Sequence, residues 1–256
     1  MSKPSVAEVR AGGQPEGIKE RVNEEHWAGR LYMRAISPYA STFFVRLGVP
    51  PNPITYLMVV CGVLAGIVVA FGGLWSALLA ALLIQVYLLL DCSDGEVARF
   101  TGRTSVTGVY LDRIGHYFAE VALLVGVGIR AQGEFTAGGW VVAGLAAALG
   151  AALIKAETDN VVVARAKAGL SDHVPAAALN PRSSGLSLAR RIASALRFHR
   201  IIQAVELSLL VVVAAVVDAV RGDLAATQVL MAACVAVAAL QTVLHLVSIL
   251  ASSRLR

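Results

Sequence analysis

Six long apolar stretches restrict this chain more than any other feature of its sequence. Each is close to the roughly 20 residues that an α-helix needs to cross the hydrocarbon core of a bilayer. No stretch alternates apolar and polar residues over the length of a membrane strand. We therefore expect an all-α integral membrane bundle with six spans, at about residues 53–72, 75–98, 105–130, 137–164, 201–220 and 225–250.

The composition agrees with a membrane protein. Of the 256 residues, 57% are hydrophobic and 15% are charged, and the mean hydropathy is +0.70. A typical soluble domain has about 25% charged residues. The net charge of +5 does not indicate a nucleic-acid partner, because the basic residues flank apolar spans instead of alternating with stacking aromatics. Anionic membrane lipids are the expected partners of these charges.

The chain divides into four parts by composition. Residues 1–17 form a polar tail that is expected to be disordered, and residues 251–256 form a second, cytoplasmic tail. Residues 18–52 mix basic and apolar side chains, which predicts a juxtamembrane helix in the membrane interface, with a break near Pro38, and an entry loop. Packing of this helix on a soluble partner is the alternative. Residues 53–250 contain the six spans.

The distribution of Lys and Arg predicts the orientation. Basic residues concentrate in the cytoplasmic loops of membrane proteins. Both termini and the polar turn near residue 101 are therefore expected to face the cytoplasm, in the plasma (inner) membrane. Of the 22 Lys and Arg residues, 18 fall in residues 1–52, 98–104, 165–200 and 251–256.

Acidic residues interrupt the apolar spans on both sides of that turn. Asp91 and Asp94 are three residues apart, and Asp112 and His116 are four apart, so each pair shares one face of a helix. Asp91 and Asp112 lie about equally far from the centre of the turn, which places them level on two antiparallel helices. Charge inside a span is costly and usually functional. Converging carboxylates suit a hard divalent cation, whereas solvated helix-end charges are the alternative.

The spacing of these residues resembles a family pattern. From Asp91 to His116 the sequence reads D-x2-D-G-x2-A-R-x8-G-x3-D-x3-H, which is similar to the motif of the class I CDP-alcohol phosphotransferases. That motif ends in a fourth aspartate, and His116 stands at its position. The six-span layout is also similar, so the resemblance covers about residues 30 to 250.

The resemblance implies a transferase of phospholipid synthesis. Its donor would be a CDP-alcohol such as CDP-diacylglycerol, its acceptor an alcohol, and its leaving group CMP. It implies one or two Mg²⁺ or Mn²⁺ ions at Asp91, Asp94 and Asp112. His116 is then the candidate base, with contact to a second metal as its other candidate role. Glu120, one turn further along, is expected to orient the imidazole.

A second set of residues is expected to bind the nucleotide and its pyrophosphate. Arg99 offers a forked contact to phosphate oxygens. Gly95 and Gly108 would leave room for the nucleotide, although small residues also serve close helix packing. The stretch from Pro50 to Thr55 resembles the family element before the first span, and its Asn52 is also a good helix N-cap. The set is Asn52, Thr55, Gly95, Ala98, Arg99 and Gly108.

Further basic residues are candidates for binding the phosphate of the acceptor or of a lipid. Four lie in the long loop from Arg165 to Arg200, where a role that only marks the cytoplasmic face is the alternative. The fifth lies in span four beside Glu157, Asp159 and Asn160, with which it would pair or line the pocket. These candidates are Lys155, Arg190, Arg191, Arg197 and Arg200.

Three other functions compete with the transferase. A cation-coupled transporter would use intramembrane carboxylates, but it does not require Gly95, Arg99 and Gly108 at fixed spacing. A catalytically degenerate homologue would account for His116. A membrane scaffold leaves the aspartates unexplained. The resemblance also implies a homodimer, while the donor and acceptor alcohols stay open.

Overall fold

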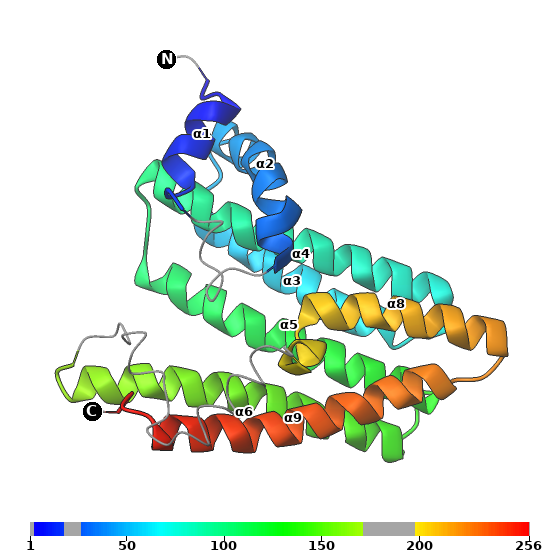
Figure 1. Cartoon of the computed structure of the whole chain (residues 1–256). Helices are drawn as coiled ribbons and strands as arrows, with labels where there is room; N and C mark the ends of the chain where they lie inside the picture. Colours follow the sequence, from blue (N-terminus) through cyan, green and yellow to red (C-terminus); the bar gives the residue numbers. More distant parts are fainter. Residues whose placement is uncertain (1–2, 18–26, 171–197, 256) are drawn as a thin grey trace. The chain divides into compact units, whose positions relative to one another are not determined.

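The computed structural model describes residues 3–17, 27–170 and 198–255, and every regular element in that part of the chain is helical (Figure 1). The all-α prediction is therefore confirmed. Two short helical turns, η2 (Gly29–Met33) and η4 (Phe198–Ile202), accompany the α-helices. The α-helices are α1 (Val6–Gly13), α2 (Arg34–Arg46), α3 (Pro51–Val69), α4 (Gly73–Thr101), α5 (Val106–Gln132), α6 (Gly139–Lys167), α8 (Ala204–Arg221) and α9 (Ala225–Ala251).

Among the described helices, α3, α4, α5, α6 and α9 are long and apolar enough to cross a membrane. Their lengths run from 19 to 29 residues, which confirms an integral membrane helical bundle. Helix α8 lies where the fifth span was predicted, but its 18 residues contain Glu206, Asp218 and Arg221. With three charged residues in 18, α8 does not count among the helices that are apolar enough to span a membrane. The count of six spans stays a prediction.

The chain forms two compact units. The first contains Met1–Ala65 and Leu78–Ala119, and the second contains Gly66–Ala77 and Glu120–Arg256. Helices α3, α4 and α5 each contribute residues to both. All the residues of the predicted acidic motif belong to the first unit.

Helix α1 lies where the sequence analysis expected a disordered polar tail. The Ser5 hydroxyl accepts a hydrogen bond from the Glu8 backbone N–H, and the Glu8 carboxylate accepts one from the Ser5 backbone N–H. This capping box satisfies donors at the helix start and lowers the pKa of Glu8. Gly13 lets α1 approach α4, because a Cβ there would lie 3.0 Å from the backbone oxygen of Glu96. The tail is thus a capped helix docked on α4.

Helix α2 continues through Pro38, where a break was expected. Proline has no N–H, so it cannot donate to the carbonyl of Arg34, four residues earlier. The side-chain amide of Gln14 donates to that carbonyl at 2.8 Å and replaces the missing helical hydrogen bond. Tyr39 and Phe43 lie exposed on the other face of α2, a pattern typical of an interfacial helix.

Small residues bring α3 and α5 close together in the first unit. A Cβ on Gly62 of α3 would lie 2.6 Å from the Cβ of Ala119 on α5. A Cβ on Gly115 of α5 would lie 2.6 Å from Cε of Met58 on α3. No larger side chain fits at either glycine without displacing a neighbour, so van der Waals packing of the two helices is tight here.

The second unit packs α6, η4 and α8 against α9. Gly128 of α5 and Gly144 of α6 meet at a similarly close crossing, where a Cβ on Gly144 would lie 2.9 Å from Cα of Gly128. Asp218 near the end of α8 accepts a 2.5 Å hydrogen bond from the Thr227 hydroxyl of α9. The second unit is therefore held together by a close glycine crossing and by a hydrogen bond between polar helix ends.

Candidate active site

The turn between α4 and α5 brings the acidic motif together. Gly102 closes this turn at φ +66°, a conformation that a residue without Cβ adopts easily. Asp91 and Asp94 lie on α4 before the turn, and Asp112 and His116 lie on α5 after it. The predicted pair of antiparallel helix ends is therefore present.

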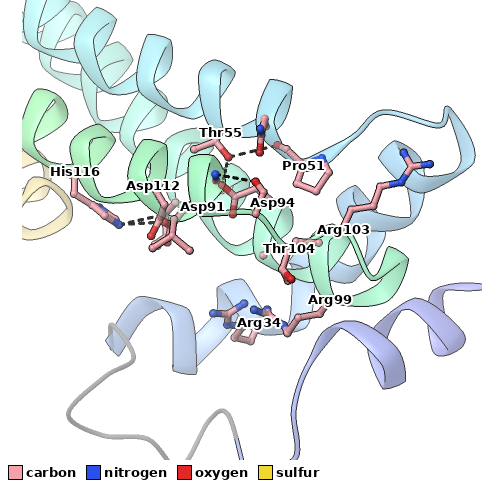
Figure 2. Close-up of a pocket in the computed structure, with 17 residues that line it drawn as sticks. Arg34, Pro51, Thr55, Asp91, Asp94, Arg99, Arg103, Thr104, Asp112 and His116 are labelled. Atoms are coloured by element: carbon pink, nitrogen blue, oxygen red, sulfur yellow. Dashed lines mark hydrogen bonds and ion pairs between the residues drawn. The ribbon is translucent and has the colours of Figure 1, made fainter. Parts of the chain in front are cut away.

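A cavity of about 450 Å³ lies beside the turn (Figure 2). In the view of Figure 2, Thr55 lies on one side of the Asp91 and Asp94 carboxylates, and Arg34 and Arg99 lie on the other. A volume of this size is typical of small-molecule sites. All the residues that line it belong to the first unit. They are Arg34, Pro51, Asn52, Thr55, Leu88, Asp91, Asp94, Gly95, Ala98, Arg99, Arg103, Thr104, Ser105, Gly108, Val109, Asp112 and His116.

Asp91, Asp112 and His116 form a group that fits a divalent cation. One ligand atom from each lies within 4.8 Å of the others. The Nε2 atom of His116 is 3.3 Å from Oδ1 of Asp91 and 3.6 Å from Oδ1 of Asp112. Two carboxylates are oxygen ligands of the kind that Mg²⁺ and Mn²⁺ prefer, whereas an imidazole nitrogen suits softer ions. The two carboxylates therefore fit the predicted metal.

Asp94 lies in the same cavity with a different partner. Its side chain is buried, and its Oδ2 accepts a 2.6 Å hydrogen bond from the hydroxyl of Thr55, which is buried as well. Asp94 is not in the group of three that converges within 4.8 Å. Its role as a metal ligand stays a prediction, and the structure adds that Thr55 fixes its carboxylate.

His116 is oriented by a residue that the sequence analysis did not single out. The hydroxyl of Tyr87 on α4 is hydrogen-bonded to Nδ1 of His116, and the two rings meet edge to face at 5.8 Å. This contact directs Nε2 toward the aspartates. Glu120, the predicted orienting residue, forms a 3.2 Å ion pair with Lys155. The orienting role of Glu120 stays a prediction.

The predicted nucleotide-binding residues all line the cavity. A Cβ on Gly108 would lie 3.2 Å from Oδ1 of Asn52, so this glycine leaves space for the Asn52 side chain. A Cβ on Gly95 would lie 3.0 Å from Nη1 of Arg99, so this glycine leaves space for the guanidinium one turn away. The small residues therefore accommodate polar side chains at the cavity wall.

Arg34 also lines the site and pairs with the buried Glu96, although the sequence analysis assigned neither residue to it. Arg34 of α2 lines the cavity, and its Nη1 lies 3.3 Å from Oε1 of the fully buried Glu96. The two residues are 62 positions apart, so no local pattern connects them. Glu96 lies inside the motif at a position that the pattern leaves variable. An acidic residue within an apolar span was the signal that could have identified it.

Two of the predicted phosphate-binding cations belong to the second unit. Lys155 belongs to α6 and pairs with Glu120, and Arg200 lies 3.7 Å from the Glu206 carboxylate in the second unit. The other three candidates, Arg190, Arg191 and Arg197, lie outside the described residues. Their predicted role is unchanged.

Comparison with known proteins identifies relatives along much of the chain. A phosphatidylinositol phosphate synthase from Streptomyces avermitilis is 31% identical over 129 residues, which cover 49% of this chain and 49% of that protein. A bifunctional IPC transferase and DIPP synthase from Aquifex aeolicus is 30% identical over 125 residues, covering 49% of this chain and 26% of that protein. An archaetidylinositol phosphate synthase from Aeropyrum pernix is 41% identical over 87 residues, covering 32% of this chain and 41% of that protein.

The chain thus spans about half, or less, of the length of these curated relatives. A family model covers a larger part of this chain. It describes the CDP-alcohol phosphatidyltransferases and matches residues 49–240, a stretch that includes α3 and the entire cavity-lining turn between α4 and α5. Because the match extends over well more than half of the sequence, this chain belongs to the CDP-alcohol phosphatidyltransferase family.

Proposed function

We propose that this protein transfers a substituted phosphate group from a CDP-alcohol, such as CDP-diacylglycerol, to an acceptor alcohol and releases CMP. The observation that supports this function best is the convergence of Asp91, Asp112 and His116 in a cavity whose other side contains Arg34 and Arg99. Carboxylates and an imidazole can bind a cation and accept a proton, while guanidinium groups suit phosphate oxygens.

In the proposed reaction, a bond forms between the acceptor oxygen and the phosphorus that bears the alcohol group. The bond from that phosphorus to the CMP oxygen breaks, and the acceptor hydroxyl gives its proton to a base. A Mg²⁺ or Mn²⁺ ion held by Asp91, Asp94 and Asp112 would neutralise negative charge on the pyrophosphate. Arg99 would bind phosphate oxygens beside Gly95, and Asn52 would contact the nucleotide beside Gly108.

His116 has two candidate roles that exclude one another at the same atom. Nδ1 is hydrogen-bonded to Tyr87, so Nε2 is the atom directed at the aspartates. One nitrogen lone pair cannot bind a cation and accept a proton at the same time. We assign Nε2 as the proton acceptor, because the carboxylates of Asp91 and Asp112 supply the harder ligands for the cation.

The acceptor to test first is an inositol phosphate. Two of the relatives are named as synthases of phosphatidylinositol phosphate and of archaetidylinositol phosphate, which makes this acceptor class the leading proposal for this chain. Lys155 and Arg200, with Arg190, Arg191 and Arg197, are the proposed contacts to its phosphate. We further propose a homodimer with termini and active site on the cytoplasmic side of the plasma membrane, since the basic residues concentrate in those segments.

The test is a turnover assay on the purified full-length protein. CDP-diacylglycerol is supplied with Mg²⁺ or Mn²⁺ and a panel of acceptors that includes inositol phosphate, inositol, glycerol phosphate and serine. CMP release and the mass of the lipid product identify the reaction. We expect metal-dependent CMP release with one acceptor class. Absence of CMP release with every acceptor, together with cation flux in vesicles containing the protein, would favour a transporter instead.

A further inference from the structure

Glu96 is a buried carboxylate that has no assigned role in the proposed reaction. It lies on α4 and is fully buried. Four side chains donate to its two oxygens: Ser37 at 2.5 Å, Ser41 at 2.6 Å, Gln14 at 2.8 Å and Arg34 at 3.3 Å. A buried carboxylate is costly unless it is paired and hydrogen-bonded, and here α1 and α2 supply the donors.

One of these donors is also part of the cavity wall. Arg34 lines the cavity with only 11% of its side chain exposed. Its Nη1 contacts the Glu96 carboxylate and, at 3.5 Å, the backbone carbonyl of Cys92. Nη1 carries only two of the five N–H donors of a guanidinium. These contacts therefore restrict where the charged group lies within the cavity.

A second cavity cation is held by the end of α1. Nε of Arg99 donates a 2.6 Å hydrogen bond to the backbone carbonyl of Gly13, and its guanidinium rests against Gly95. The next residue, Gln14, donates to both Glu96 and the Arg34 carbonyl. The Gly13–Gln14 turn therefore contacts both the Arg99 side chain and the network around Arg34.

We propose that Glu96 and the Gly13–Gln14 turn are positioning elements that hold Arg34 and Arg99 as a preset pair of cations for the phosphates of the CDP-linked donor. This inference rests on the proposed function for the identity of the donor. Fixed guanidinium groups bind phosphate more tightly than mobile ones, because less side-chain freedom is lost on binding. Arg34 is thereby assigned as a phosphate contact in addition to Arg99.

The alternative is that Glu96 and Arg34 only anchor α2 to α4. An anchor changes the stability of the protein when it is removed, but it does not change the affinity for nucleotide selectively. A positioning role raises the KM for the CDP-alcohol and leaves the KM for the acceptor and kcat nearly unchanged. Binding of CDP in the absence of acceptor separates the two roles without turnover.

The experiment compares three variants with matched controls in the full-length protein. Arg34→Gln removes the cation, Glu96→Gln removes its charged partner, and Gly13→Ala introduces a Cβ 3.0 Å from the Glu96 backbone oxygen. The control for the charge changes is Arg221→Gln, which breaks an exposed ion pair with Asp223. The control for the glycine is Gly139→Ala, where the added Cβ meets no atom within 4 Å.

We expect each of the three variants to bind CDP about tenfold more weakly than wild type, equivalent to ~1.4 kcal/mol at 25 °C, with the controls unchanged. The KM for CDP-diacylglycerol should rise by about the same factor. If Glu96→Gln does not fold, the CDP affinities of Arg34→Gln and Gly13→Ala decide whether the positioning role is correct. Wild-type CDP affinity in both, with only a lower melting temperature, overturns the inference. Wild-type protein that binds CDP but releases no CMP contradicts the proposed function and leaves the positioning inference standing.

Discussion

Replacing Thr55 by valine tests whether the buried hydrogen bond to Asp94 matters for the chemistry. Valine keeps the β-branched shape and the packing of α3, but it removes the hydroxyl that donates to Oδ2 of Asp94 at 2.6 Å. Thr55 is 2% and Asp94 7% exposed, so water does not readily replace the lost donor. A hydrogen bond to a charged acceptor contributes about 1.5–3 kcal/mol.

At ~1.4 kcal/mol per tenfold, that loss corresponds to a decrease of roughly 10- to 150-fold in kcat/KM for the CDP-alcohol. The assay is CMP release over a titration of Mg²⁺ and Mn²⁺, which also reports whether more metal is needed for half-maximal activity. Thr55→Ser retains the hydroxyl and should stay within about threefold of wild type. The reasoning is refuted if Thr55→Val, folded by its melting temperature, keeps kcat/KM within twofold of wild type.

Three further changes test the roles assigned to the other residues of the site. Asp91→Asn keeps the shape of the side chain but removes its charge, so CMP release should fall at least 100-fold with little loss of folded protein; wild-type turnover would exclude Asp91 as a metal ligand. His116→Ala should lower kcat with CDP binding retained, whereas His116→Asp, which completes the family pattern, should stay active. Equal kcat in wild type and His116→Ala would exclude His116 as the base. Tyr87→Phe should lower kcat less than His116→Ala does, because only the orientation of the His116 imidazole is lost. A loss of kcat larger than that of His116→Ala would give Tyr87 a direct role.

The acidic centre could be predicted from the sequence because its geometry is local. Asp91 and Asp94 lie on one helix, Asp112 and His116 on the next, and a short turn at Gly102 joins them. Helical periodicity and the length of the turn are enough to place these four residues near each other. The membrane helices could be predicted equally well from the sequence, because apolar runs of spanning length are a strong signal.

The partners of those residues could not be predicted, because they depend on how helices pack. Tyr87 is 29 residues from His116, and Thr55 is 39 residues from Asp94. No periodicity relates such pairs, and packing of α3 on α4 and α5 decides them. Helix α1 is a different case, since the spacing of Ser5 and Glu8 is a readable capping box that the polar composition of the tail obscured.

The close crossing of α3 and α5 has a consequence for variation at position 116. His116 lies between Gly115 and Ala119, and the separation of the two helices is fixed by the small size of Gly62, Gly115 and Ala119, with Met58 packed against Gly115. The backbone that carries the imidazole is therefore set by contacts in which the imidazole takes no part. We expect a mutation at residue 116 to exchange one functional group for another without shifting the helix axis, whereas a side chain added at Gly62 would push against Ala119 on the helix that carries Asp112 and His116. The residue that carries the functional group and the residues that set the helix packing are thus different residues within one helical turn. A histidine in place of the fourth aspartate is the kind of change that this arrangement permits.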